Sequence, residues 1–336
     1  MSGVFDYINI DYRGRAKREA IVNGILEAIE KNELPKNAPL PSINKFISKL
    51  GVARMTVVKA LNVLKERGII VAEDKVGYFV RDVNVKRELK VFVFLTGFNS
   101  YQEILYNKII EEITEPDITI DLFFHHCNPK IFKSVLQENL GSYGLYLITG
   151  FDHPVVSSLL TKVPRNKLLQ IVRPPLLEGI SSINQDFYSE LRKALDGLVE
   201  RLKSYDRFVL IFPAKKAHPE EIQKAFVHFC KDNDINYSIE RTVRKGMISR
   251  GTAFWVIEDA HLISLIKMVE EAGLEMGKEI GILSYNETPM KEIIRNGITV
   301  VSADFVQMGK AIADYIVNPS YQNKVFTPKI IFRNSL

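Results

Sequence analysis

The hydrophobic positions of the first 50 residues follow helical spacing and are interrupted by turn residues. Between residues 15 and 31, small or apolar residues recur at Ala20, Ile21, Gly24, Ile25, Ala28 and Ile29, which predicts a helix. The proline-punctuated stretch "NELPKNAPLPS" must end this helix. Ser42 follows Pro41 and is a natural N-cap for a second helix that runs to about Leu50.

A third helix is predicted from residue 53 to about residue 67, after a tight turn at Gly51. Its predicted buried positions are Val57, Ala60, Leu61 and Leu64, and its predicted outward positions are Arg54, Met55, Val58, Lys59, Asn62 and Lys65. Gly68 ends the helix, and "IIVAEDKVGYFV" then predicts two short strands with a turn near residues 74–77. This order predicts a winged helix-turn-helix over residues 1–81.

The pattern changes after residues 82–89, a charged linker. Apolar runs alternate with amphipathic stretches, and strands are predicted at residues 90–95, 118–124, 144–149, 167–172, 207–212, 252–257, 279–285 and 298–303. Strands alternating with helices predict parallel sheets that are covered on both faces. Residues 90–336 are too many for one six-stranded layer, so we expect an α/β domain of two lobes. Ligands of such sheets bind at the carboxyl ends of the strands or between lobes.

The distribution of charge along the chain indicates a class of binding partner. The chain of 336 residues has a formal net charge of +5, and residues 1–88 hold 16 Lys and Arg against 11 Asp and Glu, so the whole surplus lies there. A basic segment on an otherwise neutral protein favours a polyanionic partner. In a helix-turn-helix, the first turn of the second helix meets base edges, and Arg54 and Thr56 lie in that turn. The alternative is that this basic face is simply solvated.

The N-terminal motifs resemble the GntR family of bacterial regulators over residues 12–81: "LPS", "LGVARMTVVKAL", a helix-ending Gly and "GYFV". The resemblance implies that Arg54 reads bases, that Ser42, Lys45 and Thr56 engage phosphate, and that Gly77 lets the wing approach the minor groove. The full predicted DNA-binding set is Ser42, Asn44, Lys45, Arg54, Met55, Thr56, Lys59, Lys75 and Gly77. The family often has a basic residue at Asn44 and Val58 and a Ser at Ala53, so a different operator sequence is expected.

Residues 89–333 resemble the LacI-type effector domain, itself similar to periplasmic sugar-binding proteins, in the order of segments such as "RNKLLQIVRPP", "INQDFYSELRKALDGL" and "VVSADFVQMGKAIADYI". In that family, one turn carries an Asp that binds the sugar, and Asn286 stands at this position here. The Ala-Asn-Asp segment of the family is replaced by Ile257-Glu258-Asp259. The predicted effector-binding residues are Asn99, Tyr101, His126, Asp152, Arg173, Asp186, Phe187, Trp255, Glu258, Asn286 and Asp304. Two of these have a structural alternative: Trp255 in the core, and Asp186 as a helix cap.

Together these features predict a transcription regulator, expected to be a cytoplasmic repressor, that binds a palindromic operator as a homodimer. The combination resembles the arabinose-repressor type, which implies a monosaccharide effector such as arabinose or fucose and control of carbohydrate-utilisation genes. Two alternatives stay open. The effector could be a nucleobase or a sugar phosphate, in which case cationic residues such as Lys215 and Lys216, near the end of the strand at 207–212, would matter. Alternatively, the α/β part could be an enzyme tethered to DNA. The sequence lacks the common catalytic motifs and any apolar run that could span a membrane, so no catalytic residue, cofactor or metal is predicted.

Overall fold

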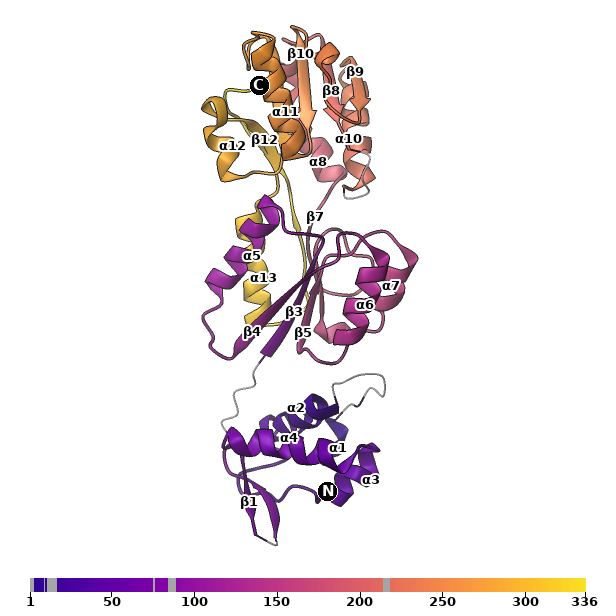
Figure 1. Cartoon of the computed structure of the whole chain (residues 1–336), viewed down its shortest axis with the longest axis vertical. Helices are drawn as coiled ribbons and strands as arrows, with labels where there is room; N and C mark the ends of the chain where they lie inside the picture. Colours follow the sequence, from indigo (N-terminus) through magenta and orange to yellow (C-terminus); the bar gives the residue numbers. More distant parts are fainter. Residues whose placement is uncertain (1–2, 9, 11–16, 75, 84–88, 214–217) are drawn as a thin grey trace.

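The computed structural model describes residues 3–8, 10, 17–74, 76–83, 89–213 and 218–336. Figure 1 shows an N-terminal domain at one end of the long axis and two α/β lobes above it. Each lobe is built on its own six-stranded sheet. Within the described residues, no helix combines the length and the apolar character needed to cross a bilayer.

The described residues of the N-terminal domain form four helices and a two-stranded antiparallel hairpin. These are α1 (Gly3–Asp6), α2 (Lys17–Glu30), α3 (Ile43–Leu50), α4 (Arg54–Glu66), β1 (Ile70–Glu73) and β2 (Gly77–Val80). One core of buried apolar side chains, from Val4 to Val80, joins all of them. The three predicted helices and the hairpin are confirmed, whereas α1 was not predicted.

Local sequence sets the turn between α3 and α4. The Ser42 hydroxyl accepts a hydrogen bond from the Lys45 amide at 3.3 Å, as an N-cap does. Gly51 takes the left-handed conformation (φ 60°) and its amide donates to the Ile47 carbonyl, so α3 stops and the chain turns. The buried stripe of α4 is as predicted, but Val58 is half-buried, not exposed, because its side chain lies at the edge of that stripe.

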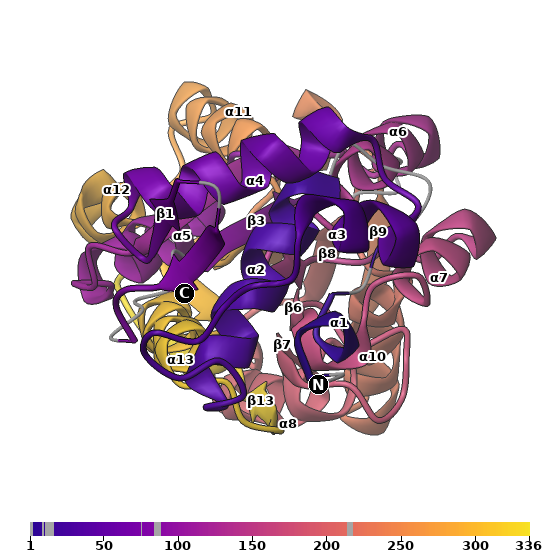
Figure 2. The ribbon, with the colours of Figure 1, turned by 90° about the horizontal axis from the view of Figure 1, so that it is seen from below.

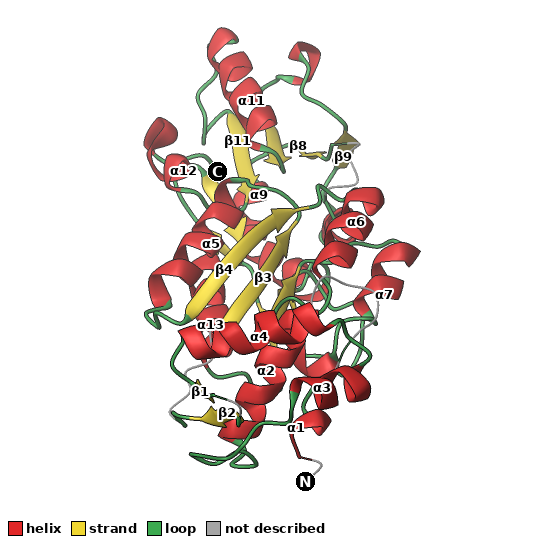
Figure 3. Ribbon diagram, turned by 60° about the horizontal axis from the view of Figure 1, so that its bottom comes forward, coloured by secondary structure: helices red, strands yellow, loops and turns green. Residues whose placement is uncertain are grey.

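The first lobe has the strand order β13-β7-β6-β5-β3-β4, and all its pairs are parallel. Its elements are β3 (Leu89–Leu95), α5 (Ser100–Glu112), β4 (Ile118–Phe124), α6 (Pro129–Asn139), β5 (Leu145–Ile148), α7 (Pro154–Leu160), a 3-10 turn (Arg165–Lys167), β6 (Leu168–Val172), β7 (Ser182–Gln185), α13 (Phe305–Val317) and β13 (Asn323–Phe326). Helices α5 and α13 share one hydrophobic core with the sheet, and α6 and α7 share another on its opposite face (Figure 3).

The second lobe has the strand order β14-β12-β11-β10-β8-β9, in which only β14 pairs antiparallel. Its elements are α8 (Ser189–Leu195), a 3-10 turn (Asp196–Leu198), α9 (Val199–Leu202), β8 (Arg207–Ile211), α10 (Glu220–Asp232), β9 (Tyr237–Glu240), a 3-10 turn (Lys245–Met247), β10 (Thr252–Val256), α11 (Asp259–Glu271), β11 (Ile280–Tyr285), α12 (Pro289–Ile293), a 3-10 turn (Ile294–Asn296), β12 (Thr299–Ser302) and β14 (Lys329–Ile331). Helices α8 and α10 pack on one face of the sheet, and α11 packs on the other.

The chain passes between the lobes three times, at residues 186–188, 303–304 and 327–328. Each lobe therefore contains segments that are far apart in the sequence, as the colours of Figure 2 show for α5 and α13. All eight strands predicted beyond residue 89 are present, and the structure adds β7, β9, β13 and β14. The predicted α/β class with two lobes is confirmed.

Candidate functional site

The exposed surface of α4 is the first candidate site. Arg54, Met55 and Lys59 are exposed there, with Met55 62% accessible despite its apolar side chain. Thr56 is half-buried. The Arg54 guanidinium donates to the Asn44 amide oxygen at 3.4 Å, which joins the start of α4 to α3. Because buried side chains hold the opposite face of α4 in the core, this face is presented rigidly to solvent.

Basic side chains are also exposed elsewhere in this segment of the N-terminal domain. Lys36, Lys45, Lys49, Arg54, Lys59, Lys65 and Arg67 are all exposed. The predicted phosphate contacts Ser42 and Lys45 lie at the beginning of α3, where amide N–H groups add positive potential. A surface of this kind attracts a polyanion through many weak contacts.

The β1–β2 hairpin forms a wing beside α4. Backbone hydrogen bonds extend it by one more segment, because Leu40 donates to the Tyr78 carbonyl at 2.9 Å and Asn37 donates to that of Val80 at 2.8 Å. Gly77 has φ 144° and no heavy atom within 4 Å of where a Cβ would stand, so its backbone is open to a close partner. The predicted contact Lys75 lies outside the described residues.

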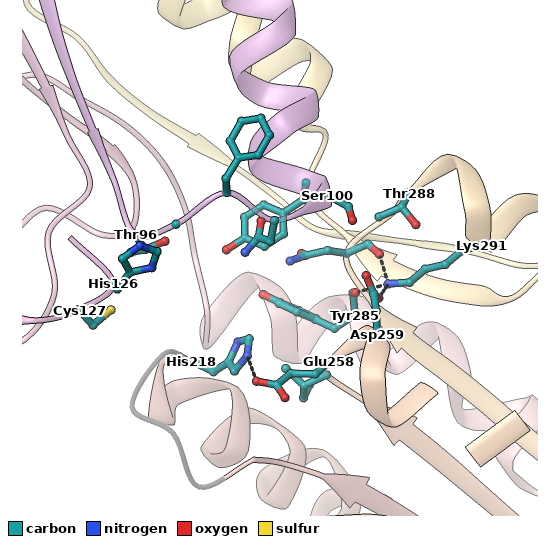
Figure 4. Close-up of a pocket in the computed structure, with 16 residues that line it drawn as sticks. Thr96, Ser100, His126, Cys127, His218, Glu258, Asp259, Tyr285, Thr288 and Lys291 are labelled. Atoms are coloured by element: carbon teal, nitrogen blue, oxygen red, sulfur yellow. Dashed lines mark hydrogen bonds and ion pairs between the residues drawn. The ribbon is translucent and has the colours of Figure 1, made fainter. Parts of the chain in front are cut away.

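The second candidate site is a cavity of about 470 Å³ between the two lobes. The first lobe contributes residues 96–101, His126 and Cys127, and the second contributes His218, residues 257–259, Tyr285, Asn286, Thr288 and Lys291 (Figure 4). Most of these residues follow the carboxyl end of a parallel strand, namely β3, β4, β10 or β11. The cavity is in the range of size of small-molecule sites.

Backbone conformation turns several side chains toward this cavity. His126 (φ 49°), Cys127 (φ 53°) and Asn286 (φ 61°) all take left-handed conformations directly after their strands. Such conformations are uncommon for residues other than glycine and concentrate at binding sites. The same strand ends that build the sheets thus also shape the cavity wall.

A buried lysine organises the wall in the second lobe. The Lys291 ammonium donates to the carbonyls of Tyr285 and Asn286, both at 2.8 Å, and lies 2.8 Å from Asp259 Oδ1. Only 3% of the Lys291 side chain is exposed. Burial lowers the pKa of Lys291, and the Asp259 carboxylate opposes that change. These contacts fix the turn that carries Asn286.

Glu258 places a carboxylate beside two histidines in the same lobe. Its carboxylate oxygens lie 3.5 Å from His218 Nε2 and 3.8 Å from His261 Nδ1. Burial lowers the pKa of His218, whereas Glu258 acts in the opposite direction. A carboxylate accepts hydrogen bonds, so Glu258, which lines the cavity, is suited to ligand hydroxyl or amine groups.

His125 lies behind the wall and holds two segments together. Its Nε2 lies 2.9 Å from the Thr149 carbonyl, and its Nδ1 accepts from the Cys127 amide at 3.1 Å. Nε2 therefore carries the proton. Burial lowers the pKa of His125 to about 3, so the ring is neutral. Although His125 and His126 are adjacent, only His126 faces the cavity.

A second, smaller cavity of about 20 Å³ adjoins the first. It is lined by Thr96, Tyr101, Thr149, Val172, Arg173, Gln185, Phe187, His218, Pro219, Tyr285 and Asn286. Seven of the predicted effector-binding residues line one or both cavities. Asn99, Tyr101, His126, Glu258 and Asn286 line the larger one, and Arg173 and Phe187 line the smaller one.

The other four predicted effector-binding residues lie elsewhere. Trp255 is fully buried in the core, where its ring packs between Phe226 and Tyr285. Asp186 accepts from the amides of Tyr188 and Glu190, so it caps α8, which was the structural alternative. Asp304 caps α13, and Asp152 is exposed. The cavity therefore does not include these four side chains.

Sequence reasoning missed several lining residues: Thr96, Gly97, Phe98, Ser100, Cys127, His218, Asp259, Tyr285, Thr288 and Lys291. Most adjoin a predicted residue at the end of the same strand, so the strand ends themselves were the usable signal. Lys291 follows its strand by six residues, and no local pattern marks it as buried.

Two family models match the chain. Residues 17–80 match the bacterial regulatory proteins of the gntR family, and residues 196–335 match the periplasmic binding protein-like domain. A curated relative, the uncharacterized HTH-type transcriptional regulator YurK of Bacillus subtilis (strain 168), is 31% identical over 94 residues. That match covers 28% of this chain and only 38% of the relative.

Solved structures resemble the two lobes. A LacI family transcriptional regulator from Lactobacillus casei with bound glucose has a TM-score of 0.61 and 16% sequence identity to this chain. The match covers 74% of this chain and 100% of the regulator's chain. The trehalose repressor from Escherichia coli has a TM-score of 0.60 and 13% sequence identity, and the match covers 73% of this chain and 100% of the repressor's chain. At these identities the likeness establishes the fold alone.

Proposed function

Because this chain joins a helix-turn-helix domain of the gntR family to a periplasmic-binding-protein-like domain, as its motifs predicted, we propose that it is a ligand-responsive bacterial transcription regulator. It binds an operator through α4 and the wing, binds a small sugar between the lobes, and acts as a repressor of carbohydrate-utilisation genes. The observation that carries the proposal is the combination in one chain of an exposed basic recognition surface and a cavity with walls from two lobes.

On the DNA side, α4 enters the major groove and Arg54 reads a guanine. Arginine is the side chain best suited to grip the two acceptors of guanine. Asn44 holds the guanidinium from α3 and limits its freedom before DNA arrives. Lys45 and Lys59 contact phosphates, and Gly77 lets the wing lie close to the minor groove.

On the effector side, the cavity matches the chemistry of a sugar. Polar groups from both lobes, such as Asn99, Glu258 and Asn286, can pair with hydroxyls. Aromatic rings of Phe98, Tyr101 and Tyr285 can cover apolar C–H faces. The glucose in the Lactobacillus casei regulator supports this ligand class.

A homodimer supplies the two recognition helices that a palindromic operator requires. Exposed apolar side chains on α5, α11, α12 and α13 offer a surface for the partner protomer: Ile110, Ile263, Met290, Ile293 and Val306. Ile293 is the most accessible of these, at 71%. Because α5 and α13 belong to one lobe and α11 and α12 to the other, closing the lobes reshapes this surface and moves the recognition helices.

The test begins with the operator. Binding sites are selected from random duplex DNA, and operator affinity is measured by fluorescence anisotropy without ligand, with L-arabinose, L-fucose, D-glucose or D-ribose, and with nucleobases or sugar phosphates. The proposal expects a palindromic site and a lower operator affinity with one sugar. A change produced only by nucleobases or sugar phosphates would replace the sugar with those ligands, and turnover of the ligand would indicate an enzyme.

The fluorescence of Trp255 provides an independent test of ligand binding in the cavity. It is the single tryptophan of the chain, and its ring centroid lies 6.1 Å from that of Tyr285, which lines both cavities. A ligand that contacts Tyr285 is expected to change Trp255 fluorescence. Operator release without such a change would indicate that the sugar acts elsewhere on the protein.

A further inference from the structure

The small cavity beside the larger one has an unusual lining. It has a volume of about 20 Å³, enough for one water molecule or one hydroxyl group. Thr149, Val172, Arg173 and Gln185 come from the first lobe, and His218 and Asn286 come from the second. Any group that fills it is therefore held by both lobes.

Two oxygens in this lining have no hydrogen-bond partner among the described residues. They are Thr149 Oγ1, on a residue with no exposed surface, and Asn286 Oδ1, on a residue that is 7% exposed. Buried polar atoms are nearly always paired, because an unpaired one costs about 1–3 kcal/mol. Both residues line the same small space, so a polar group bound there can pair with both oxygens.

Backbone geometry supports the same interpretation. The Arg173 amide donates to the Ile171 carbonyl at 2.8 Å, which closes a γ-turn centred on Val172. Val172 has φ 69°, a strained value for a β-branched residue. The turn places Val172 and Arg173 in the lining of the small cavity. Strain of this kind persists where the surrounding structure requires a particular geometry, as at ligand sites.

We propose that the small cavity is a subsite for one hydroxyl group of the effector. The inference rests on the proposed function, because it assigns part of the same ligand. The hydroxyl donates to Asn286 Oδ1 and accepts from the Thr149 hydroxyl, so it joins the second lobe to the first. A phosphate group is larger than the space, so a phosphorylated ligand must direct its phosphate to the larger cavity. Binding of this hydroxyl then favours the closed arrangement of the lobes.

The first test needs no ligand. Thr149→Val replaces the unpaired hydroxyl with a methyl group of the same shape, and Thr252→Val is the matched control. Thr252 is also buried, but its hydroxyl accepts from Arg207 Nε at 3.2 Å and lies 3.1 Å from Ser249 Oγ. Thermal unfolding is expected to leave the melting temperature of Thr149→Val at or above that of the unchanged protein and to lower that of Thr252→Val. Equal losses in the two variants would overturn the subsite.

The second test uses sugars as probes. Dissociation constants for D-glucose, D-ribose, L-arabinose and L-fucose are measured by calorimetry on the unchanged protein and on both variants. Thr149→Val is expected to raise the dissociation constant of the sugar that binds by about tenfold, which corresponds to the loss of one hydrogen bond. Thr252→Val is expected to leave that dissociation constant unchanged. Unchanged affinity in Thr149→Val would refute the subsite. If none of the four sugars binds the unchanged protein, the sugar proposal fails, and the melting temperatures alone decide the subsite.

Discussion

The ammonium of Lys291 lies 2.8 Å from a carboxylate oxygen of Asp259, and this ion pair joins α12 to the first residue of α11. The same ammonium also holds the backbone turn of Asn286. A charged group with this little exposure is maintained only by such a complete set of partners. Loss of the pair would therefore alter the cavity wall itself.

Replacing Lys291 with methionine is expected to lower the free energy of unfolding at pH 7 by about 2 kcal/mol, because two buried carbonyls lose their donor. The variant should also change the pH dependence. Burial lowers the pKa of Lys291 in the folded protein, so between that pKa and the unfolded value of about 10.4 the unfolded chain binds more protons. This lysine therefore makes stability rise with pH in that window, and Lys291→Met removes the rise.

Urea unfolding from pH 7 to pH 10 measures this effect. Lys278 provides the control, since it is exposed and pairs with Glu275 in the same lobe. Lys278→Met is not expected to remove this rise, because the hydrogen bond with Glu275 raises the pKa of Lys278 instead of lowering it. A Lys291→Met profile parallel to that of the unchanged protein would contradict the assignment.

His125 should make the protein sensitive to acid. Its pKa is about 3 in the folded protein, whereas an unfolded histidine has a pKa of about 6.5. As the pH falls from 6.5 toward 3, His125 is protonated in the unfolded chain but stays neutral in the folded protein. The free energy of unfolding is therefore about 2 kcal/mol lower at pH 5. His125→Phe is expected to lower stability at pH 7, where the bond to Thr149 is lost, but to flatten the decline to pH 5.

Unfolding of His125→Phe in urea at pH 7 and pH 5 checks this expectation. The exposed His228 serves as the control, because His228→Gln leaves the buried ring in place. If the decline between the two pH values were as steep in His125→Phe as in the unchanged protein, other groups would be responsible for it.

Two substitutions on α4 separate base reading from phosphate contact. Arg54→Ala is expected to weaken operator binding by about 1–3 kcal/mol and to relax specificity at one base pair. Lys59→Ala is expected to weaken binding to all sequences and to reduce its dependence on salt. Both are measured by anisotropy over a range of salt concentrations, with Lys224→Ala in the distant lobe as control. Unchanged affinity in Arg54→Ala would mean that α4 is oriented differently on DNA.

Gly24→Ala tests the packing of α1 on α2. Alanine in place of glycine usually stabilises a helix by about 1 kcal/mol. Here a Cβ would overlap Ile8 Cγ1 and stand 2.8 Å from the Tyr7 carbonyl oxygen, so we expect a loss of about 1–2 kcal/mol in the N-terminal domain. Gly246→Ala is the control, because nothing lies within 4 Å of its Cβ position. Thermal unfolding is the measurement, and a more stable Gly24→Ala protein would disprove the contact.

The sequence predicted elements whose apolar residues are numerous or regularly spaced. β3, with "KVFVFL", and β10, with "TAFWVI", belong to this class. It did not predict β7, which reads "SINQ", because the sheet buries those polar side chains by pairing them: Asn184 donates to Ser182 Oγ at 3.0 Å. β13 was missed for a different reason, since this edge strand is mostly exposed and lacks an apolar run.

The site could be predicted only as far as strand ends identify it. Asn99, His126 and Glu258 follow their strands closely and line the cavity, whereas Trp255 lies within its strand, where the side chain points into the core. The burial of Lys291 could not be predicted from the sequence, because it depends on Asp259, 32 positions earlier in the sequence. Contacts between distant segments leave no local pattern.

The three crossings between the lobes have a consequence for synthesis on the ribosome. The N-terminal domain closes its hydrophobic core with Val80, so it can fold as soon as that residue has emerged. The first lobe, in contrast, waits for α13 and β13, which end at Phe326, and the second waits for β14. During the translation of some 250 intervening residues, the nascent chain would carry a complete DNA-binding head with no sensor attached to it.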